Sequence, residues 1–433
     1  MKNQKTLRGA FALTAIRRLF LYSFLSIMAA GLWSGPAVAD GNAALEWNAI
    51  ATEAFLPTQG TDPVNQSRAY AMLHAAIHDA LNAIEQRYEF YTPGMSLTPS
   101  ASTDAAVAAA AHDVLVALIP AQQALIDAEY ASALAAIPEG LAKARGVLVG
   151  QTAAVLTLER RRDDGAAAAF ATPYVPTGVP GDYTFTPPFD APPFGPFAFA
   201  PGWGAVTPFG IDLRRHRLPG PLPIRSVAYA FDLAFVKAIG ELNSTVRTEE
   251  QSQIARFWYE DSPIGWNRIA NTVLGEQDVE LWKSARILAL TNFAMADGFI
   301  AGFEAKYHFR FWRPVTAIRA AASDGNRFTS PDEDWSSYLI TPPVPDYPST
   351  HTVLGAAAAH VLIHFFGDRI QFSTTSVTEP GVTRDFRGFS QAAHENGASR
   401  LYAGIHFVDA VADGYQQGAG IGRKVAHLLP PVH

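Results

Sequence analysis

The chain has 433 residues, of which 48% are hydrophobic and 17% are charged, and its formal net charge is −7. This composition is typical of a globular protein with a sizeable core, and it excludes a disordered, fibrous or collagen-like chain. Cysteine is absent, which excludes disulfides and thiolate metal sites.

The first 39 residues predict an export signal. They carry five basic residues and no acidic ones, an apolar run, "LFLYSFLSIMAAGLW", and a small-residue cleavage pattern, "AVAD", after Ala39. The pair Arg17–Arg18 followed by "LFL" resembles a twin-arginine signal. We expect residues 40–433 to be exported to the periplasm or the extracellular space; the alternative is an uncleaved membrane anchor.

Without this segment the chain keeps 28 basic residues against 40 acidic ones, so the mature net charge is −12. Proteins that bind nucleic acids usually display a basic surface, so we expect no nucleic-acid partner. Beyond the signal, no uninterrupted apolar run reaches the roughly 18 residues that a membrane span requires. We therefore expect no membrane span in the mature chain.

Helical periodicity dominates the mature chain. Apolar positions recur every three to four residues in the segments 66–84, 103–118, 121–136, 139–161, 226–242, 278–305 and 352–367. The stretch "TEEQ", 248–251, fits a capping box that opens another helix. Neighbouring segments show no convincing β-alternation, and no internal repeat is present. The sequence predicts an all-α fold in which residues 40–433 form one large helical bundle domain.

Residues 165–225 have a different composition. Their many prolines and aromatic residues exclude a regular helix or a central strand, so we expect a long irregular loop. Loops of this length in compact domains are usually functional or disordered. The sequence fits two roles for this loop equally well: a cover over a cleft, or a passive belt along the surface.

The heptapeptide "PDYPSTH", 345–351, predicts an anion site. Pro348 disfavours helix at the residue before it, and Ser349 or Thr350 is a natural N-cap, so a helix should begin at about His351. Unpaired N–H groups, the positive end of the helix dipole and two hydroxyls would together attract an anion. The alternative is a plain capping sequence with an incidental histidine.

The segment "KYHFRFWRPVTAIR", 306–319, sets cations among aromatic residues. Lys306 and Arg313 lie seven residues apart, and they would share a face if helix persisted between them. The aromatic residues favour burial, and a buried cation requires an anion. Together with Arg310 and Arg319, the same residues would also fit a solvated basic face.

The segment "ASRLYAGIHFVDAVADG" carries a third pair. Arg400 and His406 would lie about 240° apart on one helix, so a shared site requires a break, which Gly404 can supply. We expect His406 to open a new helix, with Asp409 or Asp413 holding its other ring nitrogen. The alternative is a structural histidine.

In this order the patterns K-x6-R-P, P-S-x-H and S-R-x5-H resemble the signature of the superfamily of vanadium-dependent haloperoxidases and type 2 phosphatidic acid phosphatases. They lie within residues 278–425, and segments such as "MLHAAIHDALNAI" extend the likeness toward the N-terminus. The resemblance implies a helical bundle, as the periodicity does. It also implies vanadate as the cofactor, with phosphate able to occupy the same site.

Carried over to this chain, the resemblance gives each motif residue a role. The cations around the oxyanion would be Lys306, Arg313 and Arg400, and the hydrogen-bond donors would be Ser349 and the backbone of Thr350. His406 would bind vanadium or attack phosphorus, and His351 would be the acid–base residue.

The sequence departs from the superfamily pattern at two positions. Thr350 replaces the usual glycine, which puts the pocket size in question, and the acid expected four residues after His406 is Ala410, with Asp409 one position early. We also expect Asp297, nine residues before Lys306, to pair with a site cation.

Two chemistries suit such a pocket, because vanadate imitates the five-coordinate phosphorus of phosphoryl transfer. In one, vanadate on His406 binds hydrogen peroxide. His351 takes up the proton of the peroxide, and Lys306 polarises the bound peroxide for attack by halide. In the other, His406 attacks a phosphate ester and His351 protonates the leaving oxygen. A noncatalytic phosphate-binding protein is a third possibility, but it gives His351 no role.

The residues around the motifs favour the peroxidase. The segments "FRFWRP" and "PPVPDYPSTH" resemble the soluble chloroperoxidase branch, and Phe303 keeps an aromatic residue three before Lys306. Val344, however, stands where the fungal chloroperoxidases carry an aromatic residue. The sequence therefore leaves the halide open, together with the organic substrate and the oligomeric state.

Two further histidine pairs have helical spacing. His74 and His78 lie four residues apart beside Asp79, a spacing compatible with zinc, but no third ligand accompanies them. His360 and His364 have the same spacing, and we interpret them as packed or surface residues.

Overall fold

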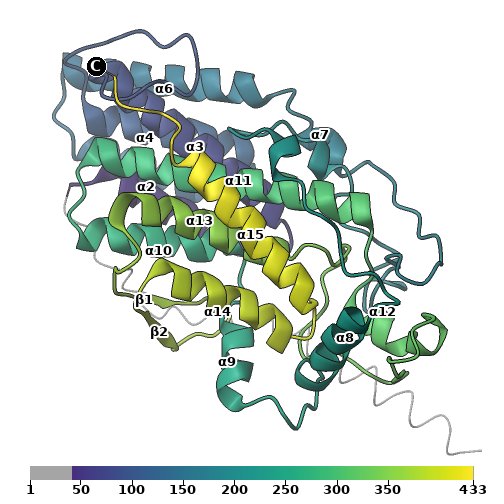
Figure 1. Ribbon diagram of the computed structural model, residues 1–433. Coiled ribbons are helices and arrows are strands. Elements are labelled where there is room, and N and C mark those ends of the chain that lie inside the picture. Colours follow the sequence, from purple (N-terminus) through teal and green to yellow (C-terminus); the bar gives the residue numbers. More distant parts are fainter. Residues whose placement is uncertain (1–40, 433) are drawn as a thin grey trace, which may run out of the picture. The chain divides into compact units, whose positions relative to one another are not determined.

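The computed structural model describes residues 41–432, and its helices and strands are labelled as in Figure 1. The predicted export signal and its cleavage site lie outside the described residues. The described chain is helical apart from one small hairpin, so the all-α prediction is confirmed. Most of the expected helices are present, with ends shifted by a few residues.

The first group of helices precedes the second half of the long loop and includes α3. Their bounds are α2 Ala43–Phe55, α3 Pro63–Ile84, α4 Thr103–Leu118, α5 Gln123–Ala135, α6 Leu141–Arg161 and α7 Ala166–Ala169, with 3-10 turns η1 Leu56–Thr58 and η2 Pro120–Gln122. Helix α3 is buried along nearly its whole length because α4, α6 and α11 surround it.

The second group carries the motif segments. Its helices are α8 Val227–Ile239, α9 Glu249–Phe257, α10 Ser262–Glu276, α11 Leu281–Phe309, α12 Pro314–Arg319, α13 Thr350–Phe366, α14 Phe389–Tyr402 and α15 Val408–Val425, with 3-10 turns η3 Trp203–Ala205, η4 Leu213–His216 and η5 Ala321–Ser323. Helix α11 lies between α3 and α13 and packs against both (Figure 1).

Of the described helices, α11 is long and apolar enough to cross a membrane, and α4 with α5 passes the same test only as a pair bent by 117°. The apolar window of α11 is 94% buried inside the protein. That burial is typical of a core helix.

Local sequence signals account for several helix ends. The capping box at 248–251 is present: the N–H of Gln251 donates to Thr248 Oγ1 at 3.2 Å, and the N–H of Thr248 donates to Gln251 Oε1 at 2.9 Å. The sequence analysis missed an antiparallel hairpin of β1, Phe372–Thr375, and β2, Thr383–Phe386. Each strand has four residues, which is too short for alternation to stand out.

Helix α15 approaches α13 closely because small residues line their contact. A methyl group added at Gly414 would lie 2.8 Å from the carbonyl oxygen of Ser349, and one added at Gly418 would collide with the carbonyl oxygen of Val353. The two glycines lie one turn apart on the same face of α15. The close contact holds the start of α13, and with it the "PSTH" segment, against α15.

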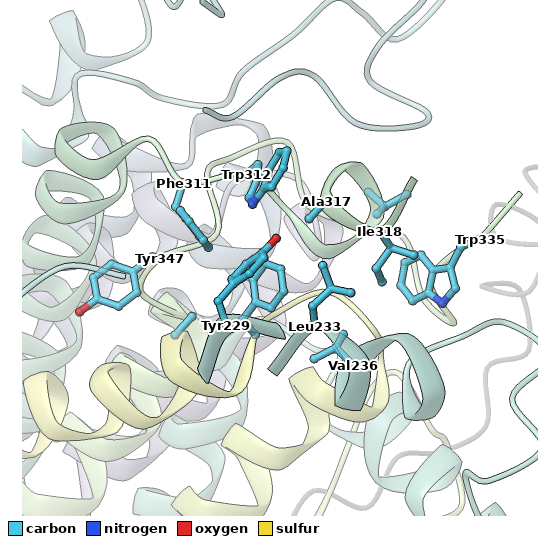
Figure 2. Close-up of a cluster of buried hydrophobic side chains, with 12 residues drawn as sticks. Tyr229, Leu233, Val236, Phe311, Trp312, Ala317, Ile318, Trp335 and Tyr347 are labelled. Carbon is cyan, nitrogen blue, oxygen red and sulfur yellow. The ribbon is translucent and has the colours of Figure 1, made fainter. Parts of the chain in front are cut away.

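A buried apolar cluster joins all three motif segments (Figure 2). The first motif contributes Phe311 and Trp312, the second Tyr347 and the third Phe407, and Tyr229 of α8 packs among them. The Phe311 and Phe407 ring centroids lie 5.7 Å apart, and the Tyr229 centroid lies 6.2 and 5.7 Å from them. Since burial of large aromatic rings is strongly favourable, this cluster fixes the motifs relative to one another.

His74 and His78 are buried within α3. His74 Nε2 lies 2.9 Å from Asn48 Oδ1, and His78 Nε2 lies 3.0 Å from the carbonyl oxygen of Glu89. Burial lowers the pKa of His74 to about 3 and that of His78 to about 4. The two rings therefore remain neutral in the folded protein down to acidic pH.

We expect His74 to make the protein sensitive to acid. Its pKa is lower in the folded chain than in the unfolded chain, where it is about 6.5. Its stabilising contribution is therefore complete above pH 6.5 and is lost as the pH falls toward 3, because only the unfolded chain takes up the proton. Between about pH 6.5 and 4 the variant His74→Gln should lose less stability than the wild type. The difference in the free energy of unfolding should grow by up to about 1.4 kcal/mol per pH unit.

Thermal unfolding of both proteins across this pH range measures the effect. The exposed His308, replaced by glutamine, serves as the control and should follow the wild type. If the unfolding temperatures of wild type and His74→Gln fell in parallel as the pH is lowered, the role given to His74 would be contradicted.

Candidate oxyanion site

Lys306 and Arg313 approach the same stretch of backbone. The helix does not persist between them as the shared-face prediction assumed, because α11 ends at Phe309 and Arg310 adopts a left-handed backbone with φ 53°. Arg313 is instead the N-cap of α12. The chain reversal, and not helical spacing, brings the two cations together.

Both cations donate to carbonyl oxygens just before the "PSTH" segment. Lys306 Nζ lies 2.6 Å from the oxygen of Pro345 and 2.8 Å from that of Asp346, and Arg313 Nε lies 2.7 Å from that of Val344. Lys306 is fully buried and Arg313 is 1% exposed. These two side chains therefore join the first motif to the second.

The other basic residues of this segment lie elsewhere. Arg310 pairs with Asp182 at 2.8 Å, and Arg319 donates to the carbonyl oxygen of Trp335 at 2.8 Å. They stabilise loops and do not reach the motif histidines.

Helix α13 begins in the "PSTH" segment, one residue earlier than expected. Ser349 is the N-cap and Thr350 is the first helical residue. The Ser349 hydroxyl makes no capping bond but accepts from Thr352 Oγ1 at 2.9 Å, and its N–H donates to the carbonyl oxygen of Ala410 at 2.9 Å. The second motif is thereby bonded to the third.

The side chain of Thr350 packs against α11. A methyl group added at Gly302 would lie 2.5 Å from Thr350 Cγ2, so the threonine methyl occupies the space that Gly302 leaves free. The side chain that replaces the superfamily's glycine is accommodated at this contact.

His351 has one partnered and one unpartnered ring nitrogen. Nδ1 lies 3.0 Å from Ser262 Oγ at the start of α10, whereas Nε2 is buried and has no hydrogen-bond partner among residues 41–432. Burial, and then the charge of Arg400, lowers the pKa of His351 well below its ordinary value. The neutral ring can therefore accept a proton from a ligand at Nε2. No sequence signal pointed to Ser262, which looks like any residue at a helix start.

The break predicted at Gly404 is present. Helix α14 ends at Tyr402, Gly404 has φ 74°, and α15 begins only at Val408. His406 therefore lies in the connecting turn, so the prediction that it opens the helix was wrong by two residues.

Arg400 reaches the site from the last turn of α14. Its Nη2 donates to the carbonyl oxygen of Trp258 at 2.6 Å, its Nε to Ser399 Oγ at 3.0 Å, and its guanidinium lies 5.6 Å from the ring centroid of Tyr259. The side chain is 4% exposed.

The contacts of His406 fix its tautomer. Nε2 lies 3.0 Å from Nη1 of Arg313, and a guanidinium only donates, so Nε2 must carry the lone pair. The proton of the neutral ring is then on Nδ1, which lies 2.9 Å from Asp346 Oδ1. His406 thus presents a free electron pair among the cations.

The sequence analysis assigned the wrong acid to His406. Asp409 accepts the backbone N–H of Leu222 at 3.1 Å, and Asp413 accepts from the hydroxyl of Tyr347. Asp346 was missed because it lies sixty residues before the histidine, and only the fold brings them together.

Asp297 was also misassigned. It accepts the backbone N–H groups of Phe209, Gly210 and Ile211 at 2.6, 2.9 and 3.1 Å and makes no contact with a site cation. Nine residues of helix correspond to a rotation of 180°, so Asp297 and Lys306 lie on opposite faces of α11.

The five charged or titratable motif side chains converge. The pKa of His406 is well below its ordinary value, first because the ring is buried and then because Arg313, Lys306, Arg400 and His351 surround it. Among residues 41–432, Asp346 is the only carboxylate within ion-pair distance of any of the three cations, at 3.8 Å from Arg313. The site therefore buries more positive than negative charge, and a bound oxyanion would offset the difference.

Part of the long loop packs against the first two motif segments. Phe199 stands edge-on to Phe303, with ring centroids 6.4 Å apart. Its N–H donates to the carbonyl oxygen of Pro343 at 2.8 Å, and its own carbonyl oxygen accepts from Tyr307 at 2.6 Å. The backbone of Phe199 is thus bonded to the residue before Val344.

Comparisons with known proteins agree with this geometry. The family model described as the VCPO second helical-bundle domain matches residues 286–430, which contain all three motifs. Vanadium chloroperoxidase from Curvularia inaequalis is 26% identical over an alignment 487 residues long, which covers 86% of this chain and 79% of that protein. Over most of its length the chain is therefore similar to vanadium haloperoxidases, as the resemblance of its motifs implied.

Solved structures of this superfamily share the fold. The first bacterial vanadium-dependent iodoperoxidase superposes with a TM-score of 0.76 at 25% identity, covering 89% of this chain and 96% of that one. A holo-type bacterial vanadium-dependent chloroperoxidase gives a TM-score of 0.69 at 20% identity, covering 84% and 91%.

The residues present fit the superfamily's oxyanion. Of the three buried cations, only Arg313 has a carboxylate within ion-pair distance among residues 41–432; Nε2 of His351 has no partner there, and Nε2 of His406 carries a lone pair. An oxyanion with a metal centre can use all of these groups at once.

Proposed function

We propose that the protein is an exported, vanadate-dependent haloperoxidase that oxidises halide with hydrogen peroxide. The observation that carries the proposal is the excess of buried positive charge around a neutral His406. The haloperoxidase relatives support the peroxidase assignment, and the N-terminal basic and apolar pattern supports export.

Each motif residue has a task in this proposal. Lys306, Arg313 and Arg400 donate to the anion's oxygens, as do the Ser349 hydroxyl and the Thr350 N–H, and His406 Nε2 is the vanadium ligand. Vanadate, when bound, supplies the Lewis acid that activates peroxide toward halide. Arg313 now donates to His406 Nε2, so binding requires its guanidinium to turn from the ring to the anion.

His351 would exchange the proton. Ser262 holds Nδ1, which leaves Nε2 as the atom that accepts a proton from peroxide and returns it. Because the ring is neutral when the substrate arrives, it can act as a base first.

The phosphatase alternative uses the same residues with a phosphate ester in place of vanadate. His406 Nε2 would then be the nucleophile, since its lone pair lies among cations that stabilise the transferring group. The two functions differ in what they require: only the haloperoxidase depends on added vanadate.

We expect bromination of a phenol dye by the purified protein with peroxide and bromide, and only after vanadate is added to vanadate-free protein. Phosphate should compete with vanadate because both would occupy the same donors. The variant Arg313→Gln should lose the activity, whereas Arg310→Gln, whose side chain pairs with Asp182, should retain it.

Iodide and chloride in parallel reactions would identify the halide. Hydrolysis of a phosphate ester without vanadate, together with no halogenation in its presence, would favour the phosphatase. Independent binding of phosphate and vanadate in equilibrium dialysis would contradict a shared pocket.

A further inference from the structure

Asp346 is a buried carboxylate beside the histidine that the proposed function makes the vanadium ligand. Its side chain is 0% exposed, and Oδ1 lies 2.9 Å from His406 Nδ1 and 3.8 Å from Arg313 Nη1. The approach to Nδ1 is bent, so the pair is close without forming a well-aligned hydrogen bond.

His406 needs a partner at Nδ1 once an anion is bound. Its Nε2 is held by Arg313 in the free site, and that contact ends when the anion takes Nε2. The ring also lies in a turn before α15, where helical packing does not fix its direction. Without a second partner the ring would be free to rotate or to exchange tautomers.

The other acids near this turn are already engaged. Asp409 accepts the N–H of Leu222, and Asp232 accepts the N–H groups of Val408 and Asp409 at the start of α15. Neither lies within ion-pair distance of His406, so among residues 41–432 Asp346 is the remaining carboxylate beside this turn.

The small residue at position 410 complements this arrangement. The superfamily pattern places an acid there, but this chain has Ala410, and Ala410 and Asp346 line the same small cavity together with Tyr347 and Phe407. A carboxylate is thus supplied from the second motif where the third motif lacks one.

We propose that Asp346 is the positioning residue for His406, holding the ring with its proton on Nδ1 so that Nε2 faces the oxyanion. A carboxylate in this place is a common partner of metal-bound histidine, and its removal typically lowers affinity about 10- to 100-fold. The inference rests on the proposed oxyanion site, but it does not depend on which reaction occurs there.

Histidine labelled with ¹⁵N tests the proposal directly, because imidazole shifts distinguish the two neutral tautomers. The His406 signal would be assigned from its absence in His406→Gln. We expect the Nδ1–H tautomer in wild type, with and without inorganic phosphate. In phosphate-bound Asp346→Ala, where Arg313 no longer holds Nε2, we expect mixed tautomers, and equilibrium dialysis should show about 10-fold or greater loss of phosphate and vanadate affinity.

Two further variants sharpen the result. Asp346→Asn retains an oxygen that can accept from Nδ1–H and should restore the tautomer, and Asp409→Asn should match the wild type. Asp346→Ser, too short to reach Nδ1, replaces the alanine variant if that protein does not fold. Wild-type tautomer and affinity in the alanine or serine variant would overturn the proposal, as would a tautomer change in Asp409→Asn alone.

The spectra require neither peroxide nor halide. A protein that shows the expected tautomers but no halide oxidation would contradict the haloperoxidase proposal and leave the role of Asp346 standing.

Discussion

Replacing His406 with alanine should remove most of the vanadate affinity and, with it, any halide oxidation. Nε2 of this histidine carries a lone pair beside Arg313, and the ring lies among the three cations. Lys306, Arg313 and Arg400 offer only protons in their charged forms, so they cannot replace the bond to the metal centre. Equilibrium dialysis with vanadate measures the loss.

His351→Ala should behave differently, although it also removes one imidazole beside the same anion. We expect it to bind vanadate while turning over about 10²- to 10⁴-fold more slowly, because proton transfer and not metal binding is lost. In a phosphatase assay the same variant should be least impaired with good leaving groups, which need no proton.

Comparing the two variants tests the division of roles. Loss of vanadate by His351→Ala with retention by His406→Ala would reverse the assignment. Normal binding and normal catalysis by both variants would show that the site lies elsewhere.

Replacing Gly302 with alanine should weaken the anion site from outside it. The added methyl would lie 2.5 Å from Thr350 Cγ2, so Thr350 and the start of α13 must shift. Overpacking of this kind typically costs about 1–3 kcal/mol of stability. Because Ser349 and His351 flank Thr350, we also expect lower phosphate affinity.

A matched control and a suppressor separate this contact from a general effect of alanine in a helix. Gly298→Ala, about one turn earlier on α11, gains the same helical preference but meets the Val353 side chain at 3.2 Å and the Leu354 side chain at 3.6 Å, which are looser contacts. Thr350→Gly in the Gly302→Ala background should restore both unfolding temperature and affinity. A Gly302→Ala protein with unchanged phosphate binding would contradict the proposed contact.

The sequence was informative wherever the signal was local. Apolar periodicity located most of the helices, the capping box at Thr248 was correct, and the need for a break at Gly404 followed from the angle between Arg400 and His406. The motif spacing also identified side chains that the fold does bring together. Each of these inferences uses residues that are close in the chain or a pattern that is already specific.

The errors concern contacts between distant residues. Asp346 and Ser262 lie beside Nδ1 of His406 and of His351, yet each comes from a different segment than its histidine, and nothing in the local sequence distinguishes it. The prediction that Asp297 pairs with a site cation could have been rejected from the sequence. A rotation of 180° from Lys306 along the helix already excludes a shared face. The fold is needed to identify the distant residues that contact a site residue. Helical geometry alone is enough to exclude a contact between two residues on opposite faces of one helix.

The glycine contact between α13 and α15 also affects how the pocket can change. Peptide groups, with no intervening side chains, set the spacing between Ser349 and the neighbouring helix at Gly414. Substitutions elsewhere on these helices can therefore alter the polarity of the pocket without altering its width. A frame of constant dimensions with an exchangeable lining is well suited to the divergence of chemistry on one fold.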